Sequence, residues 1–276
     1  MQLECGNRRL DLSRPRVMGV LNVTPDSFSD GGAFLGAEQA VARASEMAAE
    51  GADIIDIGGE STRPGAAPVS VEAELARVIP VIEALHGQVD ALLSVDTSKP
   101  EVMRAAVAAG ADIINDVCAL QAPGALEAAA QGRAAVCLMH MQGEPRTMQA
   151  DPSYENVITD VTGFLRQRVA AAEVAGIART RLLVDPGFGF GKTLAHNLSL
   201  LKHLRELADS GVPVLVGLSR KSMIGKLLDL PVEQRLHPSV ALAVIAVMRG
   251  ASIVRVHDVA ATAQALAMCA AVEQAE

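Results

Sequence analysis

Aromatic side chains are scarce in this chain of 276 residues, which contains no Trp, one Tyr and five Phe. Hydrophobic residues still make up 50% of the sequence, so the core must be built from Ala, Val, Leu, Ile and Met. No composition break, linker or low-complexity tract divides the chain. Because this length suits one large α/β domain or two small ones, the uniform composition favours a single domain over residues 1–276.

An excess of positive charge is also absent, since the formal net charge is −8. A nucleic-acid partner would require a basic face, although a few local cations could still bind an anionic substrate. The longest apolar run near the C-terminus, Val240–Met248, is too short to span a bilayer, and the N-terminal segment lacks the apolar region of a signal peptide. The four cysteines show no CxxC spacing, which favours reduced thiols. We therefore expect a cytoplasmic protein that binds neither nucleic acid nor membrane.

The stretch Gly51–Gly65, GADIIDIGGESTRPG, is the most informative in the chain. It begins as a buried strand, because β-branched Ile residues surround the single acid Asp56, and it ends in a loop too rich in Gly and Pro to continue that strand. The pattern returns as GADIIN at Gly110–Asn115 and as GASIVR at Gly250–Arg255. Continuous apolar strands are typical of a parallel sheet buried on both faces, with active groups at the carboxyl ends of its strands.

Strands and helices alternate along the chain. Apolar strands are predicted at Arg16–Asn22, Ala52–Gly58, Ala91–Asp96, Asp112–Val117, Ala134–His140, Arg181–Asp185, Val212–Leu218 and Ser252–Val256. Helical segments separate them; one is expected over Ala195–Ser210, and Thr97 or Ser98 is expected to cap the helix that begins near Pro100. Eight parallel strand–helix units predict a single-domain (β/α)8 TIM barrel of the α/β class, with an open doubly wound sheet as the alternative. A short helix near Ser222 fits the extra anion-binding helix that is common in such barrels.

Polar residues stand at the end of nearly every predicted strand. They are Asn22, Asp56, Asp96, Asn115, His140, Asp185, Lys221 and His257, with Arg255 two residues before the last. One such residue alone is more often a helix cap or a loop anchor, but a ring of them in an apolar sheet favours a site. Asp96, Asn115 and Asp185 form an acceptor-rich set that suits a planar heterocycle with several N–H donors, with Lys221 as a nearby cation.

A second set of strand-end residues is basic. Arg63, Arg255 and His257, together with Asn22, belong to the first, second and eighth strand units, which become neighbours when the barrel closes. Guanidinium and imidazole groups gathered in this way suit a phosphate or diphosphate.

Other familiar ligand-binding motifs are incomplete in this sequence. The segment Gly187–Thr193 ends like a phosphate-binding P-loop, but the first required glycine falls on Pro186, and Lys192 occupies the third glycine of a dinucleotide fingerprint. It is better interpreted as a glycine-rich loop that lets a ligand approach the backbone. No His, Cys and carboxylate set has the spacing of a zinc site.

Taken together, the motifs resemble those of the dihydropteroate synthase family. They are MGVLNVTPDSFSDGG, DIGGESTRPGA, SVDTSKPEV, IINDV, LMHMQGEPRTMQ, LLVDPGFGFGK, GLSRKSMIG and VRVHDV, in the family's order from about Arg16 to Val259. The resemblance implies a transferase of folate biosynthesis. Such an enzyme condenses 6-hydroxymethyl-7,8-dihydropterin diphosphate with 4-aminobenzoate to give 7,8-dihydropteroate and diphosphate. It also implies Mg2+ as cofactor, sulfonamides as inhibitors and a homodimer assembled through the last helices.

The resemblance also assigns residues to each ligand. It implies that the pterin is held by Asp96, Asn115, Met139, Asp185 and Lys221. It places the diphosphate against Asn22, Arg63, Arg255 and His257, with the metal near Asn22, and 4-aminobenzoate against Phe28, Thr62, Arg63, Pro64, Phe190, Lys221 and Ser222. The catalytic set it implies is Asn22, Arg63, Lys221, Arg255 and His257. The chain departs from the family pattern at His237 and Pro238, and no role can be assigned to Glu144.

Three other functions compete with this one. A pterin-binding methyltransferase would share the acid and amide pocket but would not need the ESTRPG segment or the basic pair Arg255 and His257. A non-catalytic pterin-binding paralogue should have lost Arg63 or Lys221, and both are present. A phosphosugar barrel would leave the acid and amide pocket unexplained.

Overall fold

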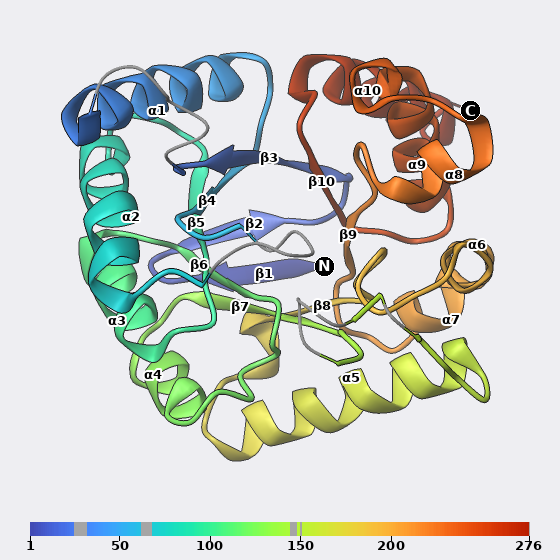
Figure 1. Ribbon diagram of the computed structural model, residues 1–276, viewed down its shortest axis with the longest axis horizontal. Coiled ribbons are helices and arrows are strands. Elements are labelled where there is room, and N and C mark those ends of the chain that lie inside the picture. Colours follow the sequence, from blue (N-terminus) through green and yellow to red (C-terminus); the bar gives the residue numbers. More distant parts are fainter. Residues whose placement is uncertain (25–31, 62–67, 144–147, 150, 276) are drawn as a thin grey trace.

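The computed structural model describes residues 1–24, 32–61, 68–143, 148–149 and 151–275. Its main sheet contains the strands β3 (Arg16–Asn22), β4 (Ile54–Gly58), β5 (Leu92–Asp96), β6 (Ile113–Asp116), β7 (Ala135–Met139), β8 (Leu182–Asp185), β9 (Leu215–Gly217) and β10 (Ile253–Val256). All pairs are parallel, in the order β8-β7-β6-β5-β4-β3-β10-β9. A single parallel bridge between Val184 and Val214 joins the two outer strands, so the sheet closes into a nearly complete barrel (Figure 1).

Helices cover the outside of this barrel (Figure 1). They are α1 (Gly32–Ala49), α2 (Val71–Leu85), α3 (Pro100–Ala109), α4 (Ala125–Gln131), α5 (Val157–Val174), α6 (Leu194–Lys202), α7 (Leu204–Ala208), α8 (Ser222–Leu228), α9 (Leu236–Met248) and α10 (Val259–Glu273), with 3-10 turns at Arg179–Arg181 and Val232–Gln234. The predicted (β/α)8 barrel is confirmed. The repeated GAD and GAS phrases mark the points where helices end: Gly110, for example, has a φ of 114°, which ends α3 and which only glycine adopts without strain.

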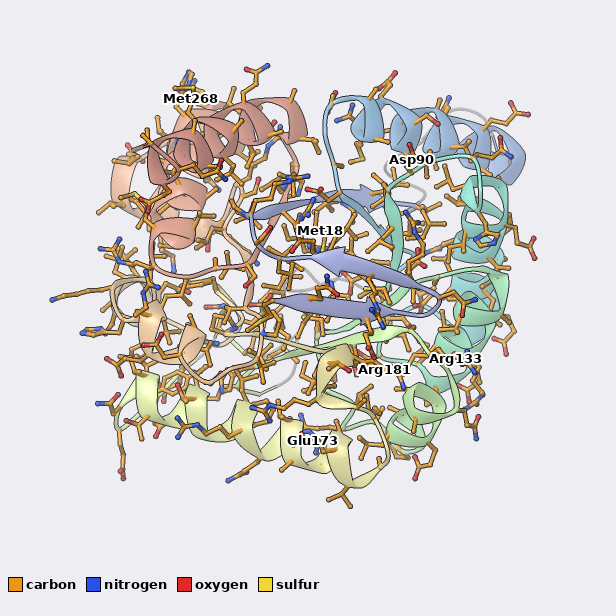
Figure 2. The ribbon with its side chains drawn as sticks, turned by 180° about the vertical axis from the view of Figure 1, so that it is seen from behind. Met18, Asp90, Arg133, Glu173, Arg181 and Met268 are labelled. Carbon is orange, nitrogen blue, oxygen red and sulfur yellow. The ribbon has the colours of Figure 1, made fainter. Side chains whose placement is uncertain are left out.

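Side chains inside the barrel form layers of different polarity. Successive residues of a strand face opposite sides, so Ile54 and Asp56 both point inward, while Ile55 and Ile57 pack outward against the helices. The inward residues nearest the strand starts are apolar and include Met18, which Figure 2 shows beside the N-terminal strands. The inward residues nearest the strand ends are the polar ones that the sequence singles out. We call the apolar end of the barrel, at the strand starts, its floor, and the polar end, at the strand ends, its mouth.

An N-terminal hairpin seals the floor, which the sequence analysis did not predict. Strands β1 (Gln2–Cys5) and β2 (Arg8–Asp11) pair antiparallel and lie across one end of the ring of strands (Figures 1 and 2). Leu3, Cys5 and Leu10 are buried against the apolar inner layer. This hairpin leaves only the opposite end of the barrel for a ligand.

Two local expectations were wrong. The segment predicted as one helix over Ala195–Ser210 breaks at His203, which ends α6 and precedes α7. The residue before α3 is Lys99, and no side chain caps the helix there. Ser98 Oγ donates to Asp116 Oδ1 at 2.5 Å, and Thr97 Oγ1 accepts from the backbone N–H of Lys99 at 3.2 Å, ahead of the first turn. Within the described residues, no helix combines the length and apolar character needed to cross a membrane.

Candidate active site at the barrel mouth

Asp56 of β4 lies at the centre of the polar mouth. Its side chain is fully buried and accepts hydrogen bonds from three strands. Ser94 Oγ of β5 donates to Oδ1 at 2.6 Å, and Asn115 Nδ2 of β6 donates to Oδ2 at 3.1 Å. Arg255 Nε of β10 also donates to Oδ2, at 2.6 Å. Asp56 was noted among the strand-end residues but left out of the predicted site, and its carboxylate fixes the orientation of two residues that were included.

Arg255 joins the two sets of residues that the sequence analysis separated. Its Nη2 donates to Asp96 Oδ2 at 2.8 Å while its Nε holds Asp56, and the neighbouring carboxylates raise its pKa against the effect of burial. The sequence grouped Arg255 with the basic residues, but its guanidinium lies between the acids of the pocket. Burial raises the pKa of Asp96 to about 7, although Arg255 opposes this effect.

Asp185 and Met139 occupy the far side of the mouth. The two residues are paired across β7 and β8, and both are buried. Asp185 Oδ1 accepts from the backbone N–H of Gly187 at 2.7 Å. Burial raises the pKa of this carboxyl to about 6, so it is ionised at neutral pH and keeps acceptor capacity for a ligand.

Lys221 lies next to the glycine-rich loop after β8. Its Nζ stands 4.3 Å from the centroid of the Phe190 ring, which is a cation–π contact. Burial lowers the pKa of Lys221 to about 8, and the nearby Asp185 opposes that shift. Ser222, the first residue of α8, is exposed. Phe190 and Lys221 are thus in contact beside the mouth, and Ser222 is the next residue along the chain.

The two other predicted site residues that the structure describes, Asn22 and His257, lie at the ends of β3 and β10. Asn22 ends β3 opposite Gly58 of β4. The sequence analysis predicted that the first, second and eighth strand units would be neighbours, and β3 does lie between β4 and β10. His257 follows β10, and its backbone N–H donates to Ser219 Oγ at 3.2 Å while its Nδ1 lies 3.1 Å from the same oxygen. Burial, assisted by Arg255, lowers the pKa of His257 to about 4, so its imidazole is neutral at pH 7.

Four predicted site residues, Phe28, Thr62, Arg63 and Pro64, lie outside the described residues, as does Glu144. Among the residues that are described, no three His, Cys, Asp or Glu side chains gather into a metal-binding group. Mg2+ accepts amide oxygens and commonly keeps several waters and substrate phosphates as ligands. The Asn22 amide oxygen near the mouth therefore fits a magnesium ion held mainly by a phosphate ligand.

His140, one of the strand-end residues, does not face the mouth. Its ring is buried and packs edge-on against Phe164 of α5, with the two centroids 4.9 Å apart. Its Nδ1 lies 2.9 Å from the Nζ of Lys192, a buried lysine whose role the sequence analysis did not identify. Because Met139 points inward, the next residue along the strand points outward.

Comparisons with known proteins agree with this geometry. A family model described as a pterin-binding enzyme matches residues 18–257. The dihydropteroate synthase of Escherichia coli (strain K12) is 57% identical over 266 residues, which cover 96% of this chain and 94% of that protein. The structure of Xanthomonas albilineans dihydropteroate synthase with 4-aminobenzoic acid has a TM-score of 0.94 and 58% identity, covering 100% of this chain and 99% of that one. The Yersinia pestis dihydropteroate synthase in complex with a sulfonamide drug has a TM-score of 0.95 and 56% identity, covering 100% of both chains. This chain belongs to the pterin-binding enzyme family.

Proposed function

We propose that the single barrel domain formed by residues 1–276 catalyses the dihydropteroate synthase reaction at its polar mouth. The enzyme joins 6-hydroxymethyl-7,8-dihydropterin diphosphate to 4-aminobenzoate and releases diphosphate. The names of the similar proteins support this activity. The main structural support is the layer of polar side chains at the mouth of an otherwise apolar barrel, where Asp56 accepts hydrogen bonds from Ser94, Asn115 and Arg255.

The pterin binds among Asp96, Asn115, Met139 and Asp185. Asp185 is buried and has one oxygen already occupied by the Gly187 amide, which fixes its orientation. An ionised carboxylate held in this way can accept two parallel N–H bonds from the 2-amino edge of the pterin ring. Met139 pairs with Asp185 in the sheet and offers an apolar contact to the ring.

The diphosphate binds on the β3 and β10 side, against Asn22, Arg63, Arg255 and His257. Arg255 has two N–H groups bound to carboxylates, so part of its five-donor fork is free for a phosphate oxygen. Mg2+ held by Asn22 and diphosphate would neutralise charge on the leaving group. Negative charge grows there as the C–O bond breaks, so these donors stabilise the transition state more than the ground state.

Chemistry at the methylene carbon requires no covalent enzyme intermediate. As diphosphate departs, positive charge develops on the pterin methylene group and is shared with the ring. The buried carboxylates of Asp96 and Asp185 lie on the pterin side and stabilise that charge. The amine nitrogen of 4-aminobenzoate then forms a bond to this carbon and afterwards releases one proton to water. It needs no strong base because an aromatic amine is a nucleophile at neutral pH. We therefore propose a dissociative substitution.

The 4-aminobenzoate slot is formed by Phe28, Thr62, Arg63, Pro64, Phe190, Lys221 and Ser222. Phe190 beside Lys221 gives it one apolar and one cationic wall. The carboxylate lies toward Ser222, at the start of α8. Sulfonamides share the aniline and the anionic head of this substrate, so they compete with it for the same slot.

The protein works in the cytoplasm as a homodimer. Large apolar side chains are exposed on α9 and α10, where Met248, Met268 and Val272 are 61%, 66% and 68% exposed. Met268 is labelled on this outer surface in Figure 2. A second copy packed against these last helices would remove that apolar area from water.

Diphosphate release from the pterin diphosphate tests the activity. With 4-aminobenzoate and Mg2+ present, the chain should release one diphosphate for each dihydropteroate formed. Release of diphosphate without product, or no reaction with either substrate, would refute the proposal. Methyl transfer from a methylated folate to a corrinoid would instead favour the pterin-binding methyltransferase.

A further inference from the structure

Lys192 is a buried lysine outside the site described above. It is 2% exposed, and its Nζ donates to the carbonyl oxygens of Gly187 and Phe190, both at 2.9 Å, and to that of His140 at 3.4 Å. The fourth neighbour is His140 Nδ1, at 2.9 Å. None of the described acids forms an ion pair with it within 4.0 Å. Burial lowers the pKa of Lys192 to about 7, although Asp185 opposes this shift, so the side chain is held in place by hydrogen bonds to carbonyl oxygens rather than by a permanent charge.

The neutral imidazole of His140 suits this arrangement. Burial, together with the nearby Lys192, lowers the pKa of His140 to about 3. Its Nδ1 can then accept a hydrogen bond from the Lys192 amino group while its other nitrogen carries the proton. Phe164 packs against the ring and helps to hold it in place.

The glycine-rich loop over residues 186–192 is shaped around this lysine. Gly187 and Gly191 have positive φ values of 66° and 61°, and a Cβ at Gly187 would lie 1.9 Å from the His140 carbonyl oxygen. Side chains from outside the loop bind two further backbone groups. Gly189 N donates to Asn197 Oδ1 at 2.7 Å, and the Tyr154 hydroxyl donates to the Gly191 carbonyl, also at 2.7 Å.

This packing explains why a sequence that resembles a P-loop does not act as one. The lysine of a P-loop reaches outward to phosphates. Lys192 instead points into the protein and binds the carbonyls of its own loop. The side chain that the loop presents to the mouth is Phe190, whose ring lies against Lys221.

We propose that Lys192 is a positioning residue: the hydrogen bonds of its buried amino group fold residues 186–191, hold Phe190 against Lys221, and so fix one wall of the 4-aminobenzoate slot. This inference rests on the proposed function, because Phe190 lines that slot only if the second substrate is 4-aminobenzoate. It predicts that loss of the Lys192 amino group damages binding of 4-aminobenzoate and spares binding of the pterin diphosphate.

Steady-state kinetics of Lys192→Met test the proposal. Methionine keeps the length of the side chain but cannot bind the carbonyls. We expect the KM for 4-aminobenzoate to rise about tenfold or more, since a misplacement of about 1 Å can cost up to about a hundredfold. The KM for the pterin diphosphate should change less than about threefold. Lys202→Met, which alters an exposed lysine of α6, is the matched control and should behave as the wild type. Equal increases in both KM values would overturn the proposal.

A double-mutant cycle shows whether Lys192 acts through Phe190. Phe190→Ala should also raise the KM for 4-aminobenzoate, and the double variant should be little worse than either single one, because both changes remove the same wall. Fully additive effects would mean that Lys192 does not act through Phe190. Lys192→Gln, which retains two N–H donors, serves if the methionine variant fails to fold, and a smaller increase in the same KM is expected for it.

Amide hydrogen exchange separates this proposal from the proposed function. The N–H groups of Gly189 and Phe190 are hydrogen-bonded in the folded loop, and they should exchange faster in Lys192→Met than in the wild type, whatever reaction the enzyme catalyses. Unchanged exchange there would refute the role of Lys192, even in a protein that makes dihydropteroate. A wild-type protein without that activity would refute the proposed function alone.

Discussion

Replacing Asp56 by Asn should damage catalysis by loosening Asn115 and Arg255, which the proposed function places against the two parts of the pterin diphosphate. The carboxylate accepts hydrogen bonds from Ser94, Asn115 and Arg255, at distances of 2.6, 3.1 and 2.6 Å. An asparagine keeps the shape but loses the charge, and its amide nitrogen faces one or more donors. Breaking a buried ion pair by removing one partner costs about 3–5 kcal/mol. Arg255 keeps its bond to Asp96 at 2.8 Å, so we expect about 2–3 kcal/mol here.

This loss can be measured as stability and as activity. For a chain of this size, a destabilisation of about 2–3 kcal/mol lowers Tm by about 3–5 °C. Because Arg255 keeps its bond to Asp96 but loses the one to Asp56, its guanidinium is less well oriented, and kcat/KM for the pterin diphosphate should fall by about a hundredfold, a typical cost of losing one preorganised donor. Calorimetry and steady-state kinetics on the same preparation give both numbers.

Asp53 offers a matched control at the opposite end of the barrel. Its carboxylate binds Arg16 at 2.7 Å, Arg14 at 2.8 Å and the backbone N–H of Val17 at 3.0 Å, so Asp53→Asn removes a comparable network. Residues on this face of a barrel serve stability. We expect Tm to fall while kcat/KM stays within about twofold of the wild type. Similar activity in the two variants would refute the view that Asp56 orients the site.

The remaining predictions concern the ligands directly. Asp185→Asn should cost about 2–4 kcal/mol in kcat/KM, because a charge-assisted pair of hydrogen bonds to the pterin is lost, and near-normal kinetics in a folded variant would remove Asp185 from the pocket. Arg255→Ala should weaken binding of diphosphate and of the pterin diphosphate but spare a pterin without phosphate, and calorimetry that shows equal weakening of all three would contradict the assignment. The pH profile of kcat/KM should be bell-shaped. Activity rises as the pH increases through about 6 to 7, where Asp185 and then Asp96 ionise, and falls above about 8, where Lys221 loses its proton. A flat profile from pH 5 to 9.5 would show that none of these groups controls the reaction.

The barrel and its ring of polar residues could be predicted because they depend on local patterns. Each strand is an apolar run that ends in a polar residue, and parallel strands bring their carboxyl ends to one edge. Asn22, Asp96, Asn115, Asp185 and Arg255 could therefore be singled out from the sequence and sorted by their chemistry, although the identities of their ligands came from the family resemblance.

The remaining features depend on contacts between distant segments. Asp56 looked like any strand-end acid, and its central place follows from strand register and from Arg255, 199 residues away. Lys192 looked like part of an unfinished P-loop, because no local pattern shows that its side chain turns inward. The N-terminal hairpin consists of two four-residue strands, too short to reveal that Leu3 and Leu10 seal the barrel floor.

A crystal structure of this enzyme with the pterin diphosphate, Mg2+ and 4-aminobenzoate or a sulfonamide would test the central claim most directly. Our account predicts that the 2-amino edge of the pterin lies on Asp185, with Asn115 and Asp96 beside the ring, and that the diphosphate lies against Arg255 and His257. The second ligand should lie against Phe190, with Lys221 between it and the pterin. Ligands bound away from the polar mouth, or a diphosphate that makes no contact with Arg255, would contradict the account.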